Sequence, residues 1–231
     1  MHLAVLMTNT DESPFSQSHP KDGQKFAALI HSLRPAWQVT VYSVKDGIFP
    51  PHDARFDGWI IGGSPASVHD GDPWIPPLLT LIRRLVAQGQ PLFGACFGHQ
   101  AIAAALSGTV GPNPGGWVFG LTETVMEDQP LRLYAAHLEQ VLTPPPGARV
   151  LGGNAECAIG AYAIGDTVLC TQYHPEMTPE FATALVQEYA PKLPPQVAAR
   201  AKASVKGSAD TNLIAERIVR FFEFTKNRLE T

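Results

Sequence analysis

The segment around Cys96 constrains the fold more than any other part of the chain. An apolar run at residues 91–95 leads directly into Cys96, and a helix-like run at residues 98–106 follows it. Gly94 and Gly98 flank the cysteine at the spacing of a nucleophile elbow, a sharp turn from a strand into a helix. Glycine permits the tight bend and the close backbone approach that this turn requires. A thiol at a helix N-terminus is favoured as the thiolate, so the segment predicts covalent catalysis.

Strands and helices alternate through the first half of the chain. Continuous or alternating apolar runs predict four strands, at residues 3–7, 38–44, 57–61 and 91–95. Apolar residues at helical spacing predict three helices, at residues 24–33, 75–87 and 98–106. This alternation indicates a parallel sheet that is covered by helices on both faces.

The second half has a different pattern, because few helices separate its predicted strands. Antiparallel pairing is therefore expected among strands at residues 121–126, 131–136, 149–152, 157–164 and 167–172. Two helices are predicted at residues 179–189 and 213–229, with a loosely patterned stretch at 192–210 between them. We therefore expect an α/β fold with an open, mostly parallel sheet, helices on both faces and a small antiparallel extension.

Composition limits the classes of function. The 231 residues are 45% hydrophobic, which is enough for a sizeable core. The net charge of −4 gives no indication of nucleic acid or an anionic membrane as a partner, and no apolar stretch approaches the roughly 20 residues of a membrane span. Residues 1–7 are too short an apolar run for a signal peptide and lack its charged start. Three cysteines without disulfide-framework spacing predict reduced thiols and a cytoplasmic protein.

The tripeptide His174-Pro175-Glu176 supplies a partner for the cysteine. A residue before proline favours extended geometry, and residues i and i+2 of an extended stretch point to the same face. We therefore expect His174 to act as a base toward the Cys96 thiol, with Glu176 behind it as the orienting carboxylate of a triad. The elbow and the tripeptide both follow predicted strands, and the carboxyl edge of such a sheet is where active sites gather.

A pair of glycines completes the expected site. Gly62 and Gly63 end the predicted strand at 57–61, and their backbone N–H groups could face a developing oxyanion. The N–H of Phe97, one residue after the nucleophile, is the natural second donor. Two glycines alone indicate only a turn, but beside the elbow they predict an oxyanion hole made by Gly63 and Phe97.

The three motifs together resemble those of the class I (triad) glutamine amidotransferases. They are GGSP at residues 62–65, GACFGHQ at 94–100 and YHPE at 173–176. Residues 64–68, 116–120 and 137–141 are similar to the stand-alone, GMP-synthase-like branch, which is itself similar to plant γ-glutamyl peptidases. The resemblance covers roughly residues 1–190 and implies a flavodoxin-like fold for that domain. Residues 191–231 match no family pattern and are expected to form a C-terminal helical extension packed on the same domain.

The resemblance implies a mechanism and a set of roles. Cys96 attacks the γ-carbonyl of a glutamine-like substrate, His174 takes and later returns the proton, and water hydrolyses the γ-glutamyl thioester. Gln100 helps to hold the amino-acid end of the substrate. No cofactor and no metal are implied. The sequence departs from the family pattern after Cys157, where Ala158 follows in place of the usual proline, so the outer substrate pocket is expected to differ.

The expected partner is glutamine or another γ-glutamyl small molecule. Two versions of the function stay open: hydrolysis of γ-glutamyl compounds by the chain alone, or delivery of ammonia to a separate synthetase protein. A homodimer stays open as well. A different Cys-dependent hydrolase on the same type of fold is a further alternative, which the His-Pro-Glu motif disfavours. A non-enzymatic module is disfavoured because Cys96, His174 and Glu176 are all present.

Several other polar or aromatic residues are expected to be structural. His99 and Trp117 are interpreted as packing residues, and His137 as a turn histidine. Cys157 and Cys170 are predicted to be inert core residues in apolar strands, and the sequence lacks the clustered ligands of a zinc site. Phe221, Phe222 and Phe224 are predicted to pack the last helix against the domain or against a second copy of the chain.

Overall fold

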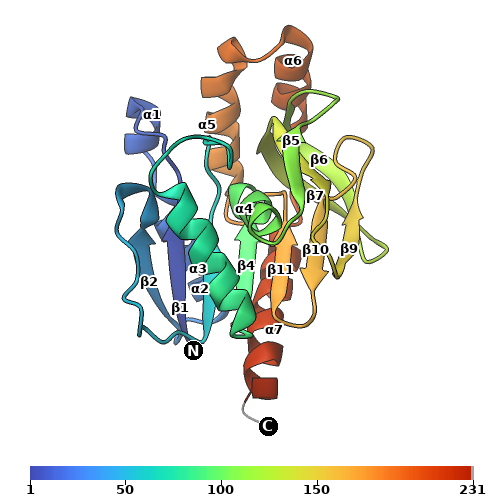
Figure 1. Cartoon of the computed structure of the whole chain (residues 1–231). Helices are drawn as coiled ribbons and strands as arrows, with labels where there is room; N and C mark the ends of the chain where they lie inside the picture. Colours follow the sequence, from blue (N-terminus) through green and yellow to red (C-terminus); the bar gives the residue numbers. More distant parts are fainter. Residues whose placement is uncertain (230–231) are drawn as a thin grey trace.

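A nine-stranded sheet organises the molecule (Figure 1). The structure is a computed structural model and describes residues 1–229. Five adjacent strands run parallel in the order β2-β1-β3-β4-β11, and β10, β9, β6 and β7 extend the sheet with antiparallel pairing. The strand bounds are β1 His2–Met7, β2 Gln38–Ser43, β3 Gly58–Ile61, β4 Leu92–Ala95, β6 Val118–Met126, β7 Gln129–His137, β9 Ala148–Gly153, β10 Ala161–Ile164 and β11 Val168–Thr171. The predicted parallel sheet with an antiparallel extension is confirmed.

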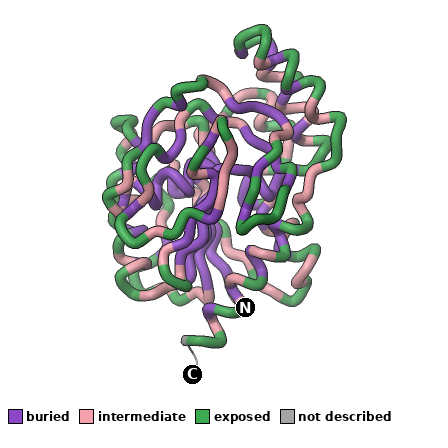
Figure 2. Tube along the Cα trace, turned by 90° about the vertical axis from the view of Figure 1, so that its right-hand side faces the viewer, coloured by how far each residue is buried: buried purple, intermediate pink, exposed green. Residues whose placement is uncertain are grey.

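Helices cover both faces of the parallel strands. Helices α2 (Asp22–Leu33) and α7 (Thr211–Leu229) pack on one face, while α3 (Ile75–Ala87) and α4 (Phe97–Ala105) pack on the other. Strand β1 shows why its sequence is a continuous apolar run, since alternate residues enter the two opposite cores. Figure 2 shows the resulting layer of buried strands inside the exposed turns and helices.

The remaining elements surround the carboxyl edge of the parallel strands. Helix α1 (Pro14–Gln17) follows β1, and helices α5 (Pro179–Tyr189) and α6 (Pro195–Ser204) stand above the strand ends (Figure 1). Strands β5 (Thr109–Pro112) and β8 (Glu139–Thr143) form a separate antiparallel pair. Two short 3₁₀ helices lie at Val44–Asp46 and Ala190–Lys192.

The last forty residues pack on the same sheet as the rest of the chain. Phe222 of α7 is fully buried, and its ring lies so close to Gly58 of β3 that a Cβ on this glycine would come within 2.5 Å of it. Helix α6 packs on β6, where the N–H of Leu121 donates to the Ser204 hydroxyl (2.9 Å). Division of the chain at residue 190 stays a prediction, and residues 230 and 231 lie outside the described residues.

Three local expectations were wrong. The strand predicted at 157–164 begins only at Ala161, because the N–H of Cys157 turns back to the Asn154 carbonyl and side chain. The stretch at 192–210 contains helix α6, whose Ala-rich sequence forms a helix despite weak apolar periodicity. Phe224 is 54% exposed, so only part of the predicted aromatic cluster packs into the core. Helix α1 and the pair β5 and β8 carried no pattern strong enough to predict them.

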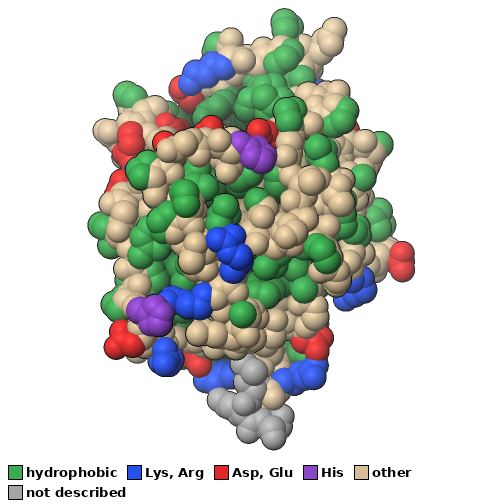
Figure 3. All heavy atoms as spheres, viewed as in Figure 1, with side chains coloured by type: hydrophobic (Ala, Val, Ile, Leu, Met, Phe, Trp, Pro, Cys, Tyr) green, Lys and Arg blue, Asp and Glu red, His purple; other side chains and the backbone are tan. Residues whose placement is uncertain are grey.

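Charge and hydropathy agree with the composition. Figure 3 shows acidic and basic side chains scattered over one face of the molecule, without a continuous area of one sign. No helix within residues 1–229 combines the length and the apolar character that are needed to cross a bilayer.

Candidate active site

Cys96 occupies the turn between β4 and α4, as the elbow motif predicts. Its φ of +50° and ψ of −107° are unusual for a residue with a side chain, and such backbone strain is concentrated at functional sites. The flanking glycines are required by packing: a Cβ on Gly94 would lie 2.7 Å from the Gly98 backbone, and one on Gly98 would lie 2.3 Å from the Ile61 carbonyl oxygen. The N–H of Cys96 donates to the Thr171 carbonyl (2.9 Å), which fastens the elbow to the end of β11.

This connection brings the second motif to the elbow. Ala95 and Thr171 are register partners in neighbouring parallel strands, so the residues that follow each strand emerge side by side. The N–H of His174 donates to the Tyr134 carbonyl of β7 (2.9 Å), and the Cys96 Sγ lies 4.0 Å from the Ala136 carbonyl oxygen of the same strand. The antiparallel extension therefore closes over the site from the opposite side.

The imidazole and the carboxylate of the predicted triad are in contact. His174 Nδ1 lies 2.8 Å from Glu176 Oε1, and both side chains are buried. The expected extended geometry is wrong, because Pro175 and Glu176 form a turn in which the Met177 N–H lies 3.5 Å from the His174 carbonyl oxygen. A turn brings residues i and i+2 together more closely than a strand does, so the pairing arises from the turn.

The electrostatics of the pair favour a charged imidazole. Burial opposes protonation, but the negative charges of Cys96 and Glu176 outweigh it and raise the pKa of His174 well above its ordinary value of 6.5. His174 Nε2 has no hydrogen-bond partner among the described residues and is therefore available to a ligand or to the thiol. The arrangement places a proton-transferring group beside a nucleophile in a desolvated site.

Gly63 lies between the cysteine and the histidine. A Cβ on this residue would come within 2.8 Å of His174 Cε1 and 3.5 Å of Cys96 Cβ. Neither the Gly63 N–H nor the Phe97 N–H donates a turn, loop or cap hydrogen bond to the backbone of residues 1–229. Glycine at 63 is thus a steric requirement of the site.

Thr8 was not predicted as a site residue, although it follows β1 at the same edge of the sheet. Its hydroxyl is fully buried and lies 3.1 Å from the Gly62 carbonyl oxygen and 3.0 Å from that of Gly63. The Gly98 N–H also donates to the Gly62 carbonyl (3.0 Å). Because N–H and C=O of a trans peptide point in opposite directions, these contacts fix the direction of the Gly63 N–H.

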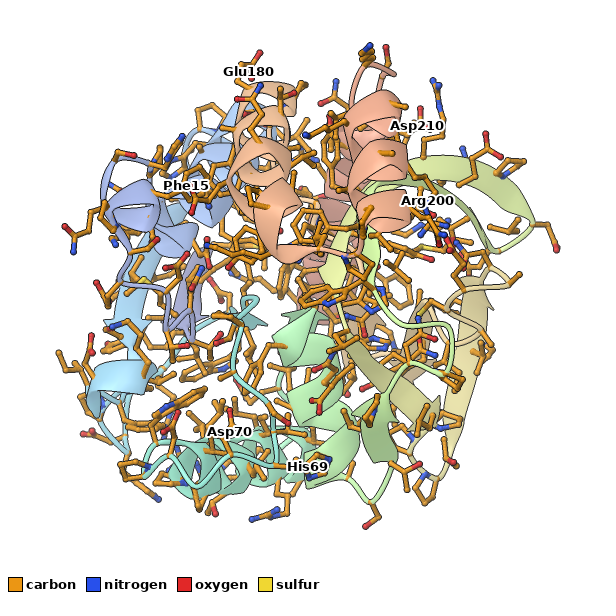
Figure 4. All side chains as sticks on the ribbon, turned by 90° about the horizontal axis from the view of Figure 1, so that it is seen from above. Phe15, His69, Asp70, Glu180, Arg200 and Asp210 are labelled. Carbon is orange, nitrogen blue, oxygen red and sulfur yellow. The ribbon has the colours of Figure 1, made fainter. Side chains whose placement is uncertain are left out.

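A cleft of about 340 Å³ opens beside these residues. Cys96, His174, Glu176 and Gly63 line its floor, and α1, the start of α2, α5 and the start of β6 contribute its walls. Figure 4 looks onto this end of the sheet and shows α1, with Phe15, beside α5. Trp117 is half-buried and lines the cleft, so its interpretation as a packing residue alone was wrong.

Gln100 lies behind the cysteine, away from the residues that line the cleft. Its amide donates to the Glu139 carbonyl (2.8 Å) and to the Gln172 side chain (3.2 Å). These contacts hold α4 against β8 and the end of β11. A role for Gln100 in holding the substrate stays a prediction.

His137 and His99 are neutral residues of the buried interior near the site. His137 ends β7 and is buried, so its prediction as a turn histidine was wrong. Burial is the main cause that lowers the pKa of His137 to about 4 and that of His99 to about 3. His99 packs against Tyr162 with ring centroids 4.8 Å apart, as expected of a packing residue.

The other two cysteines are fully buried. Burial raises the pKa of both Cys157 and Cys170 to about 12, so their thiols stay protonated at neutral pH. Cys170 lies in β11, whereas Cys157 precedes β10 instead of lying in a strand. Among the described residues, no three His, Cys, Asp or Glu side chains are grouped in a way that could hold a metal ion.

The comparisons with known proteins agree with this geometry. The family model for glutamine amidotransferase class-I matches residues 23–188. Gamma-glutamyl peptidase 2 of Arabidopsis thaliana is 29% identical over 64% of the chain, and the match spans 66% of that relative, just under two thirds. The glutamine-hydrolysing subunit of the GMP synthase of Halobacterium salinarum is 27% identical over 66% of the chain and 84% of that protein.

A solved structure has the same fold. The glutamine amido transferase of Methylobacillus flagellatus superposes with a TM-score of 0.72, at 22% identity, over 97% of this chain and 94% of that chain. The shared architecture includes the parallel sheet, its antiparallel extension and the C-terminal elements, since the match covers nearly the whole chain.

Proposed function

Since the chain belongs to the class I glutamine amidotransferase family, we propose that it hydrolyses the γ-glutamyl amide bond of glutamine or of a γ-glutamyl compound through a thioester on Cys96. The observation that carries this proposal is the convergence of Cys96, the His174–Glu176 pair and Gly63 on the floor of one cleft. A family name alone would not assign a reaction to the chain, because related folds support different chemistries.

The first half-reaction forms the thioester. The Cys96 Sγ attacks the γ-carbonyl carbon, His174 holds the proton that the thiol gives up, and the carbonyl oxygen becomes an oxyanion. Collapse of the tetrahedral intermediate breaks the C–N bond, and the leaving amine takes the proton from His174. Glu176 orients the imidazole and stabilises its charged form through the 2.8 Å contact with Nδ1.

The oxyanion is stabilised by backbone donors whose direction is already fixed. In this proposal the N–H groups of Gly63 and Phe97 bind it, and Thr8 acts as a positioning residue through the Gly62 carbonyl. Donors that need no reorganisation during the reaction give the largest electrostatic benefit. The free φ and ψ angles around Gly63 are limited by these contacts, so the donor stays aimed at the cleft.

The second half-reaction is hydrolysis. His174 removes a proton from water, which attacks the thioester carbonyl carbon. The C–S bond then breaks, the proton returns to sulfur, and glutamate is released. The overall reaction consumes one water molecule and yields glutamate and an amine or ammonia.

A second candidate is a glutaminase that delivers ammonia to a separate synthetase. The similarity to the glutamine-hydrolysing subunit of GMP synthase favours this version. In that case the leaving group is ammonia, and the cleft would have to be covered by a partner to keep ammonia from water.

Glutamate release by the purified chain tests the proposal. We expect release from a γ-glutamyl dipeptide or from L-glutamine, and its loss in Cys96→Ala, which keeps the fold because the smaller side chain fits the same turn. Release from neither substrate, with Cys96 still modified by a glutamine-analogue affinity label, would favour the partner-dependent version. Equal release by the variant would refute the Cys96 mechanism.

A further inference from the structure

The position of His174 defines where the leaving group of the substrate must lie. The departing amine takes its proton from Nε2, so the substituent on its nitrogen extends along the walls nearest to this atom. The N–H of Met177 faces the His174 carbonyl, and α5 begins two residues later. The leaving-group side of the cleft is therefore bounded by α5 and by the elements that pack against it.

These walls are aromatic. Phe119 of β6 stacks on Tyr189 of α5 with ring centroids 5.5 Å apart and planes 28° apart, and Trp117 lies edge-on to Phe119 at 6.0 Å. From the other side, Phe15 of α1 approaches Phe181 of α5 with centroids 5.9 Å apart. All five rings line the cleft. Aromatic rings that face one another across a cleft offer edges and faces to a third ring.

The wall depends on a part of the chain that the family model does not match. Phe119 shares a small hydrophobic cluster with Leu193, Ala198 and Ala201, all of which lie beyond residue 188. Helix α6 approaches β6 so closely that a Cβ on Gly120 would lie 2.5 Å from the Ser204 hydroxyl. This aromatic wall is therefore a feature of this chain and is held in place by its C-terminal extension.

The charged residues of the cleft do not form a receptor for an anion. Lys25 is held by Asp22 at 2.9 Å, and Lys45 is held by Glu12 at 2.7 Å. The third lysine, Lys21, lies 3.9 Å from the same glutamate. A leaving group with a carboxylate would have to compete with these acidic residues, whereas an uncharged ring would not.

We propose that the substrates are γ-glutamyl amides whose leaving amine carries an uncharged aromatic group. The inference rests on the proposed function and specifies the substrate class of the same site. A cleft of about 340 Å³ lies in the size range of small-molecule sites, and only a bulky amine would use its walls. Ammonia from glutamine would leave this space without contacts to the rings.

The test compares kcat/KM for three compounds: γ-glutamyl phenethylamide, γ-glutamyl alanine and L-glutamine. We expect the phenethylamide to exceed both others by about tenfold or more, the discrimination that apolar contacts in a pocket supply. Comparable values for all three compounds, each dependent on Cys96, would overturn the inference while leaving the proposed function intact. No Cys96-dependent release from any of them would overturn both.

A variant of the wall assigns the preference to the rings. Trp117→Ala should reduce the ratio of kcat/KM for the phenethylamide to that for γ-glutamyl alanine by about tenfold. Phe224→Ala is the matched control, because this exposed aromatic residue lies on α7 outside the cleft and its loss should leave the ratio as it was. If Trp117→Ala does not fold, Phe181→Ala provides the same comparison. An unchanged ratio in a folded wall variant would overturn the inference.

Discussion

Replacement of Gly63 by alanine is a sharp test of the site geometry. The added Cβ would lie 2.8 Å from His174 Cε1, whereas ordinary van der Waals contact begins at 3.4 Å. The imidazole would therefore have to move by about 0.6 Å, the difference between these two values, away from Cys96 and the backbone donors. Displacements approaching 1 Å in a catalytic constellation cost on the order of 10²-fold in rate, so we expect a loss of kcat/KM of about that size.

The neighbouring glycine supplies a matched control. A Cβ on Gly62 would lie 3.4 Å from the Phe26 ring, an ordinary contact, so Gly62→Ala should lose far less activity than Gly63→Ala. Glutamate release would be measured for both variants and the wild type, with thermal unfolding as a check that each variant folds. Wild-type kcat/KM in Gly63→Ala, or equal losses in the two variants, would refute the assignment of Gly63 to the space between the nucleophile and the base.

Three further predictions concern the base, the donor and the core. Glu176→Gln removes the negative charge that helps to raise the pKa of His174, so the alkaline limb of the kcat/KM profile should move to lower pH; an unshifted limb would contradict the pairing. Thr8→Val removes the hydroxyl that fixes the Gly62 carbonyl and should lower kcat about tenfold with little change in KM, while Thr8→Ser restores it; a loss in KM alone would indicate a different role. Phe222→Ala should reduce the free energy of unfolding by about 3–5 kcal/mol in urea titrations, and a loss below about 1 kcal/mol would mean that α7 contributes little to the core.

The elbow and the sheet could be predicted from the sequence because each depends on local residue types. The continuous apolar strands, the helical spacing and the glycines on either side of Cys96 all report on backbone packing that the structure reproduces. His174 could be paired with Glu176 from the tripeptide, but the geometry was wrong, because the sequence does not distinguish an extended segment from a turn after Pro175.

The walls of the cleft could not be predicted, because they combine segments that are distant in the chain. Trp117 was interpreted as a core residue since nothing in its neighbourhood shows that α5 and α1 leave a cleft beside it. Thr8 offered only its place after the first strand, and its bond to a glycine fifty-four residues away is a tertiary contact. Helix α6 was missed because its small apolar residues give a weak periodic pattern, although they pack closely on β6.

The central claim is that Cys96 carries the γ-glutamyl group during turnover. Acid quenching of the working enzyme, followed by mass spectrometry of its peptides, measures this directly. The account predicts a glutamyl adduct on the peptide that contains Cys96, which alkaline hydroxylamine removes as it does other thioesters and which Cys96→Ala lacks. Steady glutamate release without any such adduct, or an adduct that persists in Cys96→Ala, would contradict it.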